Sequence, residues 1–144
     1  MEKKIISSKL LFGFLILILV FHAIATVNFW YWQYLWLDIP MHFFGGFWTA
    51  MFFLWFSSKY FSNFFPKKLE EIILILSFVA LIGVFWEFYE FFSDILFSSK
   101  GYFGIMQLGA ADTIKDLFFD LFGGSVFLLI YQLIFKKKIL DNTI

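Results

Sequence analysis

The chain has 144 residues, of which 62% are hydrophobic, 26% aromatic and only 15% charged, and its formal net charge is zero. This composition leaves no room for a soluble domain beside a membrane-embedded one. The absence of cysteine excludes disulfides and thiolate metal sites, and the absence of arginine removes the usual bidentate clamp for phosphate. Lysines occur mainly beside the apolar stretches, so we exclude nucleic-acid binding.

Four apolar stretches follow one another along the chain, at about 5–27, 39–58, 70–93 and 112–135. Each is close to the length that a helix needs to cross about 30 Å of hydrocarbon. We therefore predict an all-α polytopic membrane protein, a bundle of four transmembrane helices that forms one domain over residues 1–144. The first stretch ends in the small residues Ala23 and Ala25, so a cleaved signal peptide is an alternative, but its length favours a retained helix.

Most lysines lie in three flanks: before the first stretch, between the second and third, and after the fourth. They are Lys3, Lys4, Lys9, Lys59, Lys67, Lys68, Lys136, Lys137 and Lys138. Cytoplasmic flanks of membrane proteins collect lysine and arginine, so we expect both termini in the cytoplasm. The two other connections then face outward.

Ionisable side chains recur at the outward ends of the last three stretches. Their positions are Asp38 and His42, then Glu87, Glu90 and Asp94, then Asp112, Asp116 and Asp120. Spacings of three or four residues place each set on one face of its helix. Ionisable groups inside a membrane are costly and usually functional, so we expect these side chains to form one polar layer in the outer half of the bundle.

Clustered carboxylates in a low-dielectric layer must either bind protons or recruit a cation. The donors are mostly oxygen, which favours Mg²⁺, Mn²⁺ or Ca²⁺, with iron or zinc as a secondary alternative. The predicted metal ligands are Asp38, Glu87, Glu90, Asp112, Asp116 and Asp120. We predict His42 to be a catalytic general base, with metal ligation or a hydrogen bond to a neighbouring carboxylate as the alternatives.

Purely structural roles are open for several of these residues. Asp38 and Asp112 stand where they could cap helix N-termini, and His22 fits a hydrogen-bonded histidine of the core. Five glycines are spaced so that helix backbones could approach closely. They are Gly45, Gly46, Gly83, Gly123 and Gly124.

The combined pattern resembles the YjdF-like group of small prokaryotic membrane proteins. The resemblance spans about 36–131 and rests on His42 followed by a glycine pair, on Trp86-Glu87 followed by Glu90, and on Asp112-Thr113 followed by Asp116. It implies a multi-pass protein of the prokaryotic cytoplasmic (inner) membrane. It also implies that a set of polar residues belongs together, without naming a substrate. The set is His42, Glu87, Glu90, Asp112, Asp116 and Asp120.

Three functions remain open from the sequence. The first is a metal-dependent hydrolase or transferase that acts on a membrane lipid. The second is a proton or cation transporter that uses the same carboxylates as a relay, although the inner halves of the third and fourth stretches offer few polar side chains. The third is a structural or assembly subunit that forms a homo-oligomer or contacts a small membrane partner.

Overall fold

The computed structural model describes residues 6–61 and 68–141, with side chains for 6–61 and 69–134. The elements in chain order are α1 (Ser8–Val27), α2 (Trp30–Gln33), η1 (Leu35–Leu37), α3 (Asp38–Tyr60), α4 (Lys68–Leu96), η2 (Ser98–Lys100) and α5 (Ala110–Asp141). The structure has four helices long and apolar enough to cross a membrane. The predicted all-α fold with four spanning helices is confirmed.

The observed helices extend beyond the apolar stretches. α4 begins at Lys68, and the acidic residues Glu70 and Glu71 lie in its first turn, where carboxylates interact favourably with the helix dipole. α5 continues past the predicted end at residue 135 to Asp141. The predicted start of the first helix at residue 5 and the lysines at 3, 4 and 67 lie outside the described residues, as do the side chains of Lys68 and 136–138.

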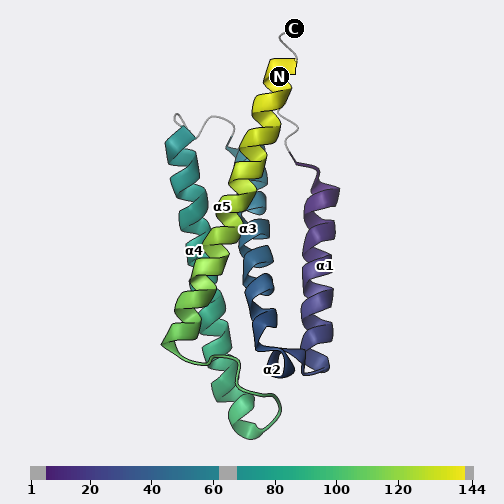
Figure 1. The fold of residues 1–144 in the computed structure, drawn as a ribbon, viewed down its shortest axis with the longest axis vertical. Coiled ribbons are helices and arrows are strands. Elements are labelled where there is room, and N and C mark those ends of the chain that lie inside the picture. The colour runs from purple at the N-terminus through teal and green to yellow at the C-terminus, as the bar shows by residue number, and fades with distance from the viewer. Residues whose placement is uncertain (1–5, 62–67, 142–144) are drawn as a thin grey trace.

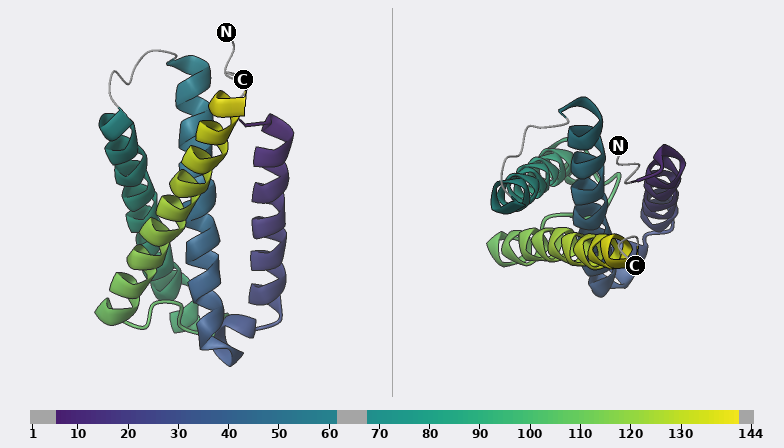
Figure 2. Two further views of the ribbon diagram at one scale, coloured as in Figure 1. Left: turned by 45° about the horizontal axis from the view of Figure 1, so that its top comes forward. Right: turned by 90° about the horizontal axis from the view of Figure 1, so that it is seen from above.

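The four long helices run alternately up and down (Figure 1). The start of α1 and the end of α5 therefore lie at the same end of the bundle. α3 packs most closely against α5, and α4 packs against both. α1 packs mainly along α3, on the side away from α4 (Figure 2). Which end of the bundle faces the cytoplasm stays a prediction.

Glycines allow the backbones of α3 and α5 to touch. A Cβ atom at Gly46 would overlap the main-chain carbonyl of Asp120, and one at Gly123 would overlap the main-chain carbonyl of Phe43. The predicted close approach of helix backbones is confirmed at these two positions. The crossing brings the beginnings of α3 and α5 together, and with them the polar residues of both helices.

The other half of the bundle is closed by apolar side chains. The buried hydrophobic core of the described residues consists of Leu11, Ala50, Met51, Leu54, Ile75, Val79, Phe127 and Leu128. Trp48 of α3 also donates a hydrogen bond to the main-chain carbonyl of Leu11, at 2.9 Å, which ties α1 to this core. The polar end and the apolar end of the bundle are therefore sharply separated.

We expect Gly46→Ala to destabilise the protein by about 1–3 kcal/mol, because the new methyl group must push α3 away from α5. Thermal unfolding in mild detergent, followed by circular dichroism, measures the effect. Gly13→Ala is the matched control, since a Cβ atom at Gly13 meets no atom within 4 Å. Equal unfolding temperatures for the two variants would contradict a tight crossing at Gly46.

Candidate metal centre

The predicted polar residues converge at one end of the bundle, where α3 and α5 begin and α4 ends (Figure 1). We call these seven residues the acidic site: Asp38, His42, Glu87, Glu90, Asp112, Asp116 and Asp120. Five of them are buried: Asp116 has no exposed surface, and His42, Glu87, Glu90 and Asp120 are at most 6% exposed. Carboxylates buried on this scale either take up protons or are paired with positive charge.

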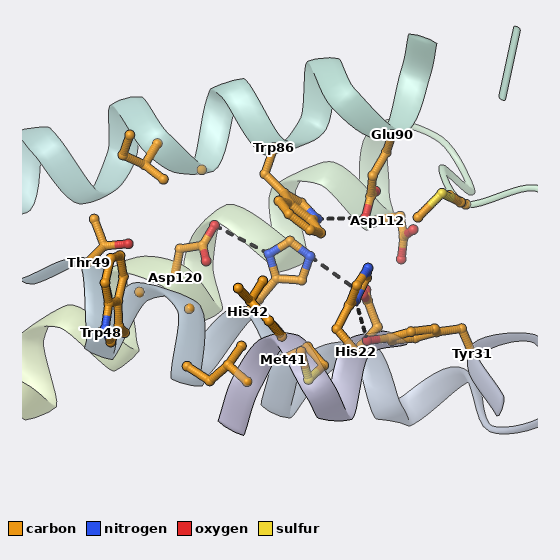
Figure 3. A pocket seen from close by; sticks show the side chains of 18 of the residues that line it. His22, Tyr31, Met41, His42, Trp48, Thr49, Trp86, Glu90, Asp112 and Asp120 are labelled. Atoms are coloured by element: carbon orange, nitrogen blue, oxygen red, sulfur yellow. Dashed lines mark hydrogen bonds and ion pairs between the residues drawn. The ribbon is translucent and has the colours of Figure 1, made fainter. Parts of the chain in front are cut away.

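His42 is held between two carboxylates from different helices. Its Nδ1 lies 3.3 Å from Asp120 Oδ2, and its Nε2 lies 3.5 Å from Asp38 Oδ1 (Figure 3). The Asp120 carboxylate fits only because α4 has a glycine opposite it, since a Cβ atom at Gly83 would press on Asp120 Oδ2 and on Leu117. Gly46 of α3 and Gly83 of α4 therefore make room for Asp120 from two sides.

Glu87 has one satisfied oxygen and one without a partner. Its Oε2 accepts hydrogen bonds from Thr113 Oγ1 at 2.7 Å and from Gln107 Nε2 at 3.3 Å. Its Oε1 is buried and accepts no hydrogen bond from the described residues. Thr113 and Gln107 thus fix the carboxylate and leave one oxygen available for another ligand.

Glu90 lies one turn further along α4. Its Oε1 accepts a hydrogen bond of 2.9 Å from Trp86 Nε1, as Figure 3 shows. This pairing of residues four apart on one helix orients the Glu90 carboxylate toward His42.

Lys115 places its ammonium group among three carboxylates. Its Nζ pairs with Asp112 Oδ1, lies 3.3 Å from Asp116 Oδ1 and lies 3.6 Å from Asp38 Oδ2. The side chain is about one third exposed. One positive charge is therefore built into the acidic site by the chain itself.

Three groups of residues bring potential metal ligands within 4.8 Å of one another. They are Asp38–His42–Glu90, His42–Glu87–Asp116 and Asp38–Asp112–Asp116. Asp120 belongs to none of these groups, and Lys115 already contacts all three members of the last. The two other groups meet at His42.

The group of His42, Glu87 and Asp116 is entirely buried, and we call it the buried triad. Four of its atoms have no hydrogen-bond partner within the described part of the chain: His42 Nε2, Glu87 Oε1 and both Asp116 carboxylate oxygens. Lys115 offsets part of the charge on Asp116 but does not reach the other two residues. A divalent cation would satisfy these atoms together, so the arrangement fits a metal ion.

A cavity of about 230 Å³ opens beside the buried triad. Its polar end is formed by Asp38, His42, Glu90, Asp112 and Asp120, and its remaining walls are mostly apolar (Figure 3). Of the triad, only His42 lines the cavity, and Glu87 and Asp116 lie behind it. An ion bound at His42 Nε2 would therefore have the buried residues Glu87 and Asp116 on one side and the cavity on the other.

Asp94 and His22 make local hydrogen bonds near the acidic site. Asp94 accepts hydrogen bonds from the main-chain nitrogens of Met106 and Gln107, which folds the connection between α4 and α5 back toward the acidic site. The expectation of a hydrogen-bonded His22 is confirmed, since its Nδ1 lies 2.8 Å from the Tyr31 hydroxyl. Burial raises the pKa of the Tyr31 phenol above its usual range, so the hydroxyl stays protonated.

The two candidate helix caps differ from one another. Asp38 is the first residue of α3 and makes no capping hydrogen bond. Asp112 accepts a hydrogen bond from the main-chain nitrogen of Leu108 at 3.2 Å, just before α5. Asp112 therefore combines a structural contact with its ion pair to Lys115, whereas Asp38 points its charge into the site.

The sequence interpretation missed three contributors. Lys115 was not among the candidate residues, and its three carboxylate partners come from two helices. Gln107 lies in a connection whose path the sequence does not reveal. The hydrogen bond between Trp86 and Glu90 could have been anticipated, because residues four apart are neighbours on a helix.

The fold and the site together define a polytopic helical membrane protein with a buried acidic centre. The chain belongs to the family described as predicted membrane protein (DUF2238), whose family model matches residues 1–137. No curated protein and no solved structure matches the chain. The match confirms the expected family of membrane proteins, and the YjdF-like name stays a prediction.

We expect Lys115→Met to open a second cation position, because it leaves Asp38, Asp112 and Asp116 facing one another without a positive charge. Elemental mass spectrometry on protein loaded with Mn²⁺ should show an increase from about one ion to about two per chain. Lys100→Met, an exposed lysine at the same end of the bundle, is the control. Unchanged metal content in Lys115→Met would show that Lys115 does not stand in for a cation.

Proposed function

We propose that this protein binds one divalent cation, Mg²⁺, Mn²⁺ or Ca²⁺, at the buried triad and uses it in the hydrolysis or group transfer of a membrane lipid. The observation that carries the proposal is a set of four buried ligand atoms on His42, Glu87 and Asp116 that make no hydrogen bond within the described residues. Two of them have only longer ionic contacts, His42 Nε2 with Asp38 at 3.5 Å and Asp116 Oδ1 with Lys115 at 3.3 Å. Leaving such atoms unpaired in a protein interior is costly, so a ligand that satisfies them all at once is strongly favoured.

The geometry supports ligation by His42 rather than the general-base role. Asp120 lies against Nδ1, while Nε2 points toward the other carboxylates. A carboxylate on one imidazole nitrogen commonly orients the ring so that the other nitrogen faces a metal. In this proposal Asp120 is a positioning residue, and His42, Glu87 and Asp116 are the ligands.

Glu90 is the best placed general base. It is buried, it lines the cavity, and its carboxylate is oriented by Trp86 on the cavity side of His42. A divalent ion supplies polarisation of a bound oxygen and stabilises developing negative charge. Glu90 would take the proton from the attacking water or hydroxyl, and Asp38 lies across the same polar end to receive a hydrogen bond from the substrate.

We place the site in the outer half of the cytoplasmic membrane of a prokaryote, with both chain termini inside. The lysine distribution supports this orientation. A membrane lipid is the proposed partner because the cavity has a polar end and apolar walls within the membrane-spanning part of the bundle.

The apolar half of the bundle argues against the transport alternative. A conducting path needs polar groups or water along its whole length, and the residues between the acidic site and the opposite end form the apolar core around Leu54, Ile75 and Val79. The acidic site therefore opens to one side only, as a catalytic pocket does.

Lipid turnover in vesicles tests the proposal. Protein reconstituted into vesicles of bacterial total lipid extract should change the lipid composition only when a divalent cation is supplied, as measured by lipid mass spectrometry. Glu90→Gln should lower the rate by about 10²–10⁴-fold while the metal remains bound, because only the base is lost. The Glu87→Gln/Asp116→Asn double variant should lose both turnover and metal.

Glu70→Gln is the matched control, since Glu70 lies on α4 at the opposite end of the bundle. Its turnover should equal that of the unmodified protein. If no lipid changes with any of the three cations, or if the double variant turns lipid over at the full rate, the proposed activity is wrong.

A further inference from the structure

The cavity beside the metal centre continues away from the polar residues as an apolar arm. Its walls come from three helices: Leu15, Ile18 and Leu19 of α1, Trp48 of α3, and Val79 and Ile82 of α4. These residues place the arm across the face of α3. Figure 2 shows that α1 lies on one side of α3 and α4 on the other. Polar and apolar parts belong to one continuous space.

The arm is open toward the surface between α1 and α4. Leu19 of α1 is 53% exposed and Ile82 of α4 is 39% exposed, and both line the cavity. These are membrane-spanning segments, so the medium outside this opening is the hydrocarbon of the bilayer. A molecule that enters here arrives from within the membrane rather than from water.

The size of the space limits what can occupy it. At about 230 Å³ the cavity lies below the usual range of about 300–1,000 Å³ for sites that enclose a whole small-molecule ligand. A space of this size has room for one hydrocarbon chain rather than two, so any further chain of the ligand would lie outside the opening, in the bilayer.

We infer that the substrate is an amphiphile that places one hydrocarbon chain in the arm between α1 and α4 and its polar group at the acidic end of the cavity, beside His42. The inference deepens the proposed function by naming the substrate class, and it rests on that function for the reaction. The binding of the chain stands on the cavity alone.

Photolabelling tests the inference directly. The probe is a long-chain fatty acid with a diazirine in mid-chain, added to the full-length protein in vesicles of phosphatidylethanolamine and phosphatidylglycerol. We expect label on cavity residues of α3 that annular lipid cannot reach, above all the buried Thr49. Label confined to the outward faces of the helices would overturn the inference.

Ile18→Trp should remove the label from α3 by filling the arm from α1. Ile16→Trp is the matched control, because Ile16 lies on the same helix, is 60% exposed and is absent from the cavity wall. Ile82→Phe, with Leu81→Phe as its control, blocks the arm from α4 and keeps the test decisive if Ile18→Trp does not fold. Undiminished label on Thr49 in both filled variants would also overturn the inference.

Metal content measured on the same samples separates the two claims. Label on α3 in protein that binds no divalent cation supports the chain-binding arm and counts against the metal-dependent reaction. Bound metal with no label on α3 would contradict the inferred substrate class and would still support the metal centre.

Discussion

The contact between the backbones of α3 and α5 is the constraint on which the acidic site depends. Gly46 lies against the main chain of Asp120, and Gly123 lies against the main chain of Phe43. Without these glycines the helices would stand further apart, and His42 would not meet the Asp120 carboxylate. The same approach carries Asp116 into the interior, where it has no exposed surface. Small residues at a helix crossing thus determine both the packing of the bundle and the position of its charges.

Charge balance explains the rest of the arrangement. The six carboxylates of the acidic site share one end of the bundle, and the chain places the ammonium group of Lys115 among three of them. Lys115 reaches the side of the site formed by Asp38, Asp112 and Asp116, whereas Glu87 and His42 Nε2 lie beyond it. A buried charge without a partner is strongly destabilising, and the divalent cation proposed at the buried triad would complete the balance.

The fold was largely predictable from the sequence, because membrane-spanning helices are encoded in long apolar runs and every backbone polar group must be satisfied within the helix. The layer of charges was also predictable, since helical spacing from Asp38 to His42 and from Asp112 to Asp120 fixes which side chains share a face. The role of each charged side chain within the site was not predictable from the sequence. Whether Asp120 faces a metal or a histidine depends on how α3 crosses α5, and periodicity within one helix carries no such information.

The roles of Lys115 and Gln107 show the same limit. From the sequence, Lys115 is a charged residue near the start of the last helix. Only the packing of α3 against α5 shows that its ammonium group lies among three carboxylates. Gln107 reaches Glu87 because Asp94 folds the connection between α4 and α5 back over the site. Neither contact has a signature in local sequence. The apolar arm of the cavity, which lies between helices that are far apart in the chain, has none either.

Metal content is the most direct test of a cation at His42, Glu87 and Asp116. The protein purified in mild detergent without chelator, and supplemented in turn with Mg²⁺, Mn²⁺, Ca²⁺, Fe²⁺ and Zn²⁺, would be analysed by elemental mass spectrometry beside the Glu87→Gln/Asp116→Asn variant. The account predicts a stoichiometric divalent ion in the unmodified protein and none in the variant. The absence of bound metal under every condition, or its full retention in the variant, would contradict it.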